Sequence, residues 1–218
     1  MPIIAMGGYP NEPLLDDVLQ HARGREVLVV PTAANEDPAG TLAWYTRLRA
    51  LGASMSHAHF FPWPPSDLRE RTLASDVVVV PGGNTANMLA IWRTHGFDAV
   101  LREAWDTGVV LTGWSAGAIC WFEHAVTDSF GPQLEPMECL GFLPGSACPH
   151  YDGEALRRPR YAELVRGGFP PGIAIDDAAA VRFDGRELTE VVTSRAGAGA
   201  YRVSSSGEER LEARLVSG

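Results

Sequence analysis

Short runs of apolar, mostly β-branched residues recur along the first half of the chain, and most of them end at glycine or proline. The clearest runs cover 3–6, 26–30, 76–80 and 109–112, with a weaker candidate at 54–61. Runs that are apolar on both faces are typical of strands buried in a parallel sheet. Amphipathic stretches of helical length separate them, at about 12–23, 38–51, 85–94 and 98–107. This alternation predicts an α/β fold with a mostly parallel sheet and helices on both of its faces.

The pattern changes in the second half. The segment 123–149 is rich in glycine and proline and is predicted to be the longest irregular stretch, of the kind that often carries function. A surface helix is expected at 154–166, and strands at 173–175 and 179–183, followed by a hairpin turn at 183–186. The tail from 188 to 218 is predicted to add edge strands. The whole chain, 1–218, is interpreted as a single domain.

Composition and charge exclude several classes of protein. Hydrophobic residues make up 45% and charged residues 21% of 218 residues, which is ordinary for a globular domain. The net charge is 18 − 27 = −9, so nucleic acid is not an expected partner. All basic residues are arginine, which excludes a phosphate-binding loop lysine, a Schiff-base lysine and a Ser-Lys dyad.

The cysteines and the hydropathy of the chain indicate which cellular location and which kinds of site to expect. Three cysteines without a CxxC pair argue against both a disulfide framework and a zinc site. No apolar run approaches 18 residues, and the first residues do not resemble a signal peptide. We therefore expect a cytoplasmic protein without membrane contact, metal or organic cofactor; a homo-oligomer is left open.

The sharpest chemical signal is the sequence Gly-Trp-Ser-Ala-Gly at 113–117. It follows the apolar run 109–112 and precedes a helix-competent stretch, which is the setting of a nucleophile elbow. There the hydroxyl of Ser115 would stand at a helix start above the sheet edge. The alternative is a glycine-rich turn with an ordinary serine.

A serine nucleophile needs a base, and without lysine that base is expected to be histidine. His150, just after the irregular segment, is the preferred candidate, and His124 is the second. The orienting acid stays open between Asp128 and Asp177, because distance along the chain does not rank neighbours in space. Asp152 is better interpreted as a turn residue.

A second glycine-rich loop, Pro-Gly-Gly-Asn-Thr at 81–85, follows the run 76–80. The N–H groups of Gly83 and Ala116 could together form an oxyanion hole. A phosphate cradle or a plain strand-end turn are the alternatives. Asn84, in the same loop, is a candidate for substrate binding.

Taken in this order and spacing, the PGGNT, GWSAGA and PH sequences resemble the peptidase E and cyanophycinase family of serine peptidases. The resemblance implies a flavodoxin-like three-layer αβα sandwich, with Ser115 as nucleophile, His150 as base and Gly83 in the oxyanion loop. Asp128 and Asp177 both match acidic positions of the family. Arg157, with Arg160 nearby, falls near an arginine that recognises an N-terminal aspartate in the family's dipeptidases. Ile119 departs from the asparagine of the dipeptidase pattern.

These observations predict a serine peptidase that hydrolyses short peptides through a Ser-His-Asp triad and an acyl-enzyme. A dipeptidase or another exopeptidase, with or without Asp-X specificity, fits this description. The alternatives are a small-substrate esterase or amidase on the same scaffold and a non-catalytic module that binds a small anion.

Overall fold

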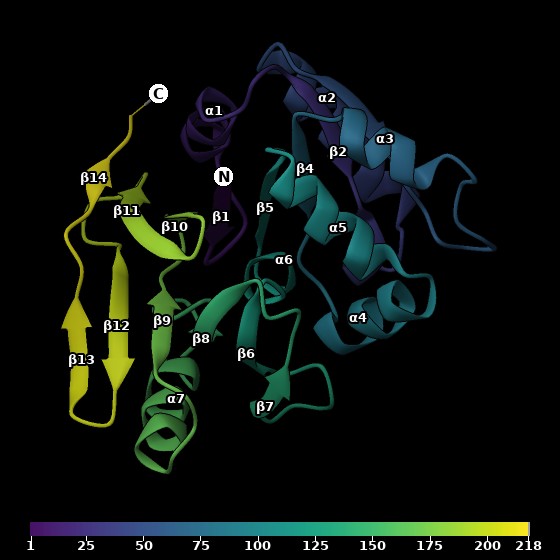
Figure 1. Ribbon diagram of the computed structural model, residues 1–218. Coiled ribbons are helices and arrows are strands. Elements are labelled where there is room, and N and C mark those ends of the chain that lie inside the picture. Colours follow the sequence, from purple (N-terminus) through teal and green to yellow (C-terminus); the bar gives the residue numbers. More distant parts are fainter. Residues whose placement is uncertain (218) are drawn as a thin grey trace.

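Two β-sheets form the framework of the protein (Figure 1). The computed structural model describes residues 1–217. The first sheet has eight strands in the spatial order β14-β11-β10-β1-β5-β4-β2-β3. Their bounds are β1 (Pro2–Met6), β2 (Glu26–Val29), β3 (Ser54–His57), β4 (Val77–Val80), β5 (Val110–Trp114), β10 (Ala179–Asp184), β11 (Glu187–Thr193) and β14 (Arg214–Leu215).

The five strands from β1 to β3 in this order run parallel. β1, β5, β4 and β2 are mostly buried between two helical layers, whereas the edge strand β3 is only partly buried. The helices are α1 (Glu12–Gln20), α2 (Pro38–Ala50), α3 (Leu68–Ala74), α4 (Thr85–Thr94) and α5 (Phe97–Asp106). Alternate strand residues face opposite layers, so Ile4 packs with α1 and α2, whereas Ile3 packs with α3, α4 and α5. This confirms the expected α/β class. The short α3 was not expected from the sequence.

Side-chain caps fix where helices begin next to the sheet edge. The Asp37 carboxylate accepts from the N–H groups of Ala39 and Gly40 at the start of α2. Asn84 accepts from the N–H of Asn87 at the start of α4. Such caps satisfy amides that have no partner within the helix, so they set the ends of the loops that follow the strands.

The segment 123–149 is not irregular, and in this the sequence prediction was wrong. It carries most of three strands of a second, six-stranded sheet in the order β13-β12-β9-β8-β6-β7. In Figure 1 this sheet lies below the first. Its strands are β6 (Phe122–Thr127), β7 (Glu135–Glu138), β8 (Leu143–Cys148), β9 (Gly172–Ile175), β12 (Ala200–Ser204) and β13 (Gly207–Arg210). Helix α7 (Arg157–Arg166) packs on it through Tyr161 and Val165.

The C-terminal strands extend both sheets. β10 pairs antiparallel with β1, β11 pairs with β10 across the expected hairpin, and β14 follows at the edge. β12 instead pairs antiparallel with β9. The expected edge strands are therefore present, but they are divided between two sheets.

Candidate active site

Ser115 occupies a sharp turn between β5 and a one-turn helix, α6 (Ala116–Ile119). Its backbone has φ 53° and ψ −114°, a sparsely populated conformation for a residue with a side chain. The Ser115 N–H donates to the carbonyl of Met6 at the end of β1, over 3.2 Å. The Ser115 carbonyl accepts from Ala118 and Ile119, which starts the helix. This strained strand-to-helix turn has the geometry of a nucleophile elbow.

Both glycines of the elbow sit against the neighbouring strand β4. A Cβ atom at Gly113 would lie 2.3 Å from the Val80 carbonyl oxygen, and one at Gly117 would lie 1.9 Å from the same atom. Any side chain at either position would collide with backbone. The two glycines therefore allow the turn to fold close to the sheet, and the turn fixes where Ser115 stands.

His150 follows β8 and meets the same end of β1. Its N–H donates to the Gly7 carbonyl over 3.3 Å, so adjacent carbonyls of one strand end hold Ser115 and His150. His150 Nδ1 lies 2.7 Å from Asp177 Oδ1. With the proton of Nδ1 directed to this carboxylate, Nε2 is left as the basic nitrogen. The second sheet thus brings a histidine and an acid to the same end of β1 that bonds the elbow.

Four residues that the sequence analysis did not select hold Asp177 in place. A Cβ atom at Gly8 or at Gly153 would lie 2.0 Å from an Asp177 carboxylate oxygen, so both glycines make room for the carboxylate. Asp152 accepts from the Asp177 N–H over 2.7 Å, and Arg195 pairs with Asp152 and donates to the Asp177 carbonyl. The glycine pair Gly7-Gly8 after the first apolar run was the available signal in the sequence.

The Gly82–Gly83 loop passes directly beside the nucleophile. A Cβ atom at Gly82 would lie 3.2 Å from Ser115 Cβ. Gly83 has φ 143°, and a Cβ there would lie 1.9 Å from the Ala33 carbonyl oxygen, so the loop needs glycine. Within residues 1–217, neither the Gly83 N–H nor the Ala116 N–H donates to a backbone carbonyl. Their role as an oxyanion hole stays a prediction.

Asp128 contacts Arg157, whereas Asp177 contacts His150. It is exposed, and its carboxylate lies 3.6 Å from a nitrogen of the Arg157 guanidinium. The following Ser129 accepts from the first amides of α4 and receives a hydrogen bond from Asn84 Nδ2. This loop is thus tied to the start of α4, and it places Asp128 next to Arg157.

The three residues expected to bind substrate all have partners within the protein. Asn84 caps α4 and bonds the Ser129 carbonyl. The Arg157 side chain is only 3% exposed and bonds Glu154 and the Val126 carbonyl. Arg160 bonds the Leu134 carbonyl and Glu163. A substrate role for any of them stays a prediction.

The structure places His124, the second candidate for the base, on a strand of the second sheet. The elbow helix α6 stops at Ile119, and His124 lies on β6, where its ring contacts Phe169 at 5.8 Å between centroids. The chain turns into a strand because Phe122, Ala125 and Val126 are buried in the second sheet. Two other histidines, His21 and His95, are the C-cap residues of α1 and α4.

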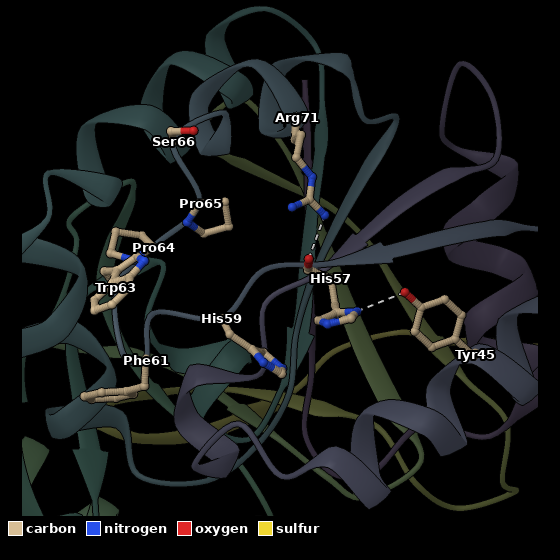
Figure 2. Close-up of a pocket in the computed structure, with 9 residues that line it drawn as sticks. All are labelled: Tyr45, His57, His59, Phe61, Trp63, Pro64, Pro65, Ser66 and Arg71. Atoms are coloured by element: carbon tan, nitrogen blue, oxygen red, sulfur yellow. Dashed lines mark hydrogen bonds between the residues drawn. The ribbon is translucent and has the colours of Figure 1, made fainter.

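A cavity of about 530 Å³ lies at the edge strand β3 (Figure 2). Tyr45 from α2 reaches His57 Nδ1 at 2.9 Å, and Arg71 from α3 donates to the His57 carbonyl. Burial, and next the neighbouring His59 and Arg71, lower the pKa of His57. No residue that lines this cavity is among the predicted site residues, so it is separate from the elbow.

The cysteines and the possible metal ligands of residues 1–217 lie as follows. Cys120, Cys139 and Cys148 are buried, and burial raises the pKa of Cys139 and of Cys148 to about 12. Across residues 1–217, no three His, Cys, Asp or Glu side chains cluster in a way that could hold a metal ion. The same residues contain no helix with the length and apolar character needed to cross a bilayer.

We expect iodoacetamide to leave the folded protein unmodified and fully active. Buried thiols with raised pKa values form little thiolate, which is the reactive species. Mass spectrometry after alkylation, with and without denaturant, measures this directly. Rapid alkylation of the native protein would contradict the burial of all three thiols.

Comparison with known proteins identifies the family. The model of Peptidase family S51 matches residues 4–191. The chain belongs to peptidase family S51. The uncharacterized peptidase YgaJ of Bacillus subtilis is 45% identical over 222 residues, covering 98% of this chain and 96% of its own. Peptidase E of Citrobacter koseri is 31% identical over 106 residues, covering 48% of this chain and 44% of that one.

A solved structure shares the fold. A peptidase from an acI-B1 actinobacterium superposes with a TM-score of 0.71 over 97% of this chain and 94% of that chain, at 18% identity. This likeness confirms the fold, while family S51 and its members support peptidase activity.

Proposed function

We propose that this S51 member is a serine peptidase that hydrolyses short peptides with Ser115, His150 and Asp177. The observation that carries the proposal is the convergence of a strained serine elbow and a histidine–carboxylate pair on one strand end, at Met6 and Gly7. Serine, base and orienting acid are the set that acyl transfer to a hydroxyl requires.

The proposed reaction proceeds in two steps. Ser115 Oγ attacks the scissile carbonyl carbon while its proton passes to His150 Nε2, and Asp177 stabilises the imidazolium through Nδ1–H. The N–H groups of Gly83 and Ala116 donate to the developing oxyanion. The C–N bond then breaks, and His150 returns the proton to the leaving amine. Water, deprotonated by His150, attacks the acyl-enzyme and releases the acid and free Ser115.

The same residues would serve an esterase or amidase, and a folded chain without catalysis would be a binding module. A fluorophosphonate probe separates a serine hydrolase from a binding module, because it phosphonylates only an activated serine. We expect labelling of Ser115 in the wild type and in the exposed-serine control Ser66→Ala, and none in Ser115→Ala. Hydrolysis of a dipeptide library then supports a peptidase. Cleavage of esters alone would favour the esterase, and an unlabelled folded protein would overturn the proposal.

Asp177→Asn is expected to reduce turnover by about 10⁴, the scale for removing an orienting acid. Asparagine keeps the size and a hydrogen-bonding oxygen but loses the charge that stabilises the imidazolium. Asp128→Asn is the matched control, since it removes a carboxylate that faces Arg157 instead of His150. Steady-state kinetics on one dipeptide measures both variants. If both keep most of their activity, the site operates as a dyad; if only Asp128→Asn fails, the acid is Asp128.

A further inference from the structure

A cavity of about 330 Å³ opens beside the serine elbow, on the side of α2. It is formed by the loop after β1, the 3-10 helix η1 (Pro31–Ala34), the first turns of α2, and the strand ends before Gly82 and Ser115. Its walls include Tyr9, Trp44 and Trp114. None of the residues predicted above to bind or cleave substrate lines it.

The cavity and the nucleophile share a wall. Trp114 immediately precedes Ser115, and Gly82 approaches both, since a Cβ built on Gly82 would lie 2.9 Å from Trp114 Nε1 and 3.2 Å from Ser115 Cβ. A peptide whose carbonyl reaches Ser115 therefore has the cavity next to its scissile bond. One flanking side chain of that peptide would be directed into it.

The walls are aromatic. The Trp44 and Trp114 rings lie 4.8 Å apart between centroids, and Tyr9 packs against both at 5.9 and 5.3 Å. Trp44 and Trp114 are buried in the core, which holds the walls rigid, whereas Tyr9 is 59% exposed at the mouth. Such a surface gains free energy by burying apolar or aromatic groups.

Charge on the walls disfavours an acidic side chain. Within residues 1–217, the charged residue lining the cavity is Asp37, whose carboxylate is bound by the first amides of α2. Arg47 lies over the Tyr9 and Trp44 rings; its Nε and Nη2 bond Glu12 and the Pro10 carbonyl, whereas its buried Nη1 has no hydrogen-bond partner, and Arg47 does not line the cavity. A substrate carboxylate in the cavity would face the Asp37 carboxylate, and no arginine lines the cavity to offset that repulsion.

We propose that this cavity binds a large apolar side chain, aromatic or branched aliphatic, of the residue next to the scissile bond. The proposal rests on the serine peptidase function above and specifies its substrate class. Burying a leucine or phenylalanine side chain corresponds to a preference of about 10- to 100-fold over glycine. The volume suits one side chain and its entry path, at the lower limit of small-molecule sites.

Two exposed alanines on α2 provide a matched pair of variants. Ala43 lines the cavity, whereas Ala39, one helical turn earlier, does not. Ala43→Leu would fill part of the cavity, and Ala39→Leu adds the same side chain outside it. We expect Ala43→Leu to lower the ratio of kcat/KM for phenylalanine- over glycine-containing dipeptides at least tenfold, and Ala39→Leu to leave this ratio unchanged.

A dipeptide matrix that varies both positions among Gly, Leu, Phe and Asp tests the wild type. The inference is supported if Leu and Phe exceed Gly and Asp at least tenfold in one position. It is overturned if Asp is preferred or if Ala43→Leu changes nothing, even though the probe labels Ser115. Calorimetry of the same dipeptides binding to the Ser115→Ala variant gives a second measurement that does not need catalysis. If Ser115 is not labelled and no dipeptide is hydrolysed, the proposed function is wrong. If dipeptides with Phe and with Asp bind equally well, only the assignment of the cavity is wrong.

Discussion

Ser115→Ala is expected to remove peptide hydrolysis almost completely, by on the order of 10⁶ in kcat, while the protein stays folded. Alanine retains the Cβ atom that the elbow conformation already accommodates, so the backbone strain at this position does not change. Only the attacking oxygen is lost. The measurement pairs kcat on a cleaved dipeptide with thermal unfolding followed by circular dichroism.

The control for this variant is Ser66→Ala, which removes a hydroxyl from the cavity at β3 instead. It should keep wild-type kinetics. Turnover close to wild type in Ser115→Ala would show that another group attacks the carbonyl, and the assignment of the elbow as the nucleophile would be withdrawn. If Ser115→Ala loses both activity and the folded signal, the test uses Ser115→Cys instead. The fluorophosphonate probe distinguishes this thiol variant from the wild-type serine.

His150→Ala is expected to lose nearly as much activity as Ser115→Ala, because base and nucleophile act as a unit. His150 has φ 52°, a conformation that asparagine tolerates better than alanine. His150→Asn therefore provides a second variant that keeps the turn but has no basic nitrogen. Both are compared with wild type by kcat/KM between pH 6 and 9.

His124→Ala is the matched control, since it removes an imidazole from β6 that packs against Phe169. We expect it to retain most of the activity and to lose some stability. If His124→Ala were inactive and both His150 variants active, the general base would be His124. In that case the 2.7 Å contact between His150 and Asp177 would be structural.

The parallel half of the fold could be predicted because its strands are apolar on both faces. β4 is four consecutive valines, all buried, and sequence alone identifies such a strand. The strands of the second sheet lack this signal. β7 reads Glu-Pro-Met-Glu with only half of its residues partly buried, and β8 contains Pro144 and Gly145. Their pairing depends on tertiary partners that no local pattern encodes.

The elbow, the candidate base and the loop at Gly83 could be identified from the sequence, because each is a local motif at a strand end. The choice between Asp128 and Asp177 could not. Asp128 follows β6 and Asp177 follows β9, the two parallel neighbours of β8, so both candidates lie at the same end of the second sheet as His150. Asp177 reaches His150 because Gly8 and Gly153, far apart in sequence, both leave space for its carboxylate.

The attachment of Ser115 and His150 to Met6 and Gly7 has a consequence for how the protein matures. The groups of the proposed triad come from segments that are distant along the chain, and they meet only after β1 has been inserted between β5 and β10. Contacts of such high sequence separation form late, because closing long loops costs entropy before the contacts repay it. A partly folded chain thus has no assembled triad. Under the proposed function, two partly folded copies would therefore not hydrolyse each other's unfolded segments.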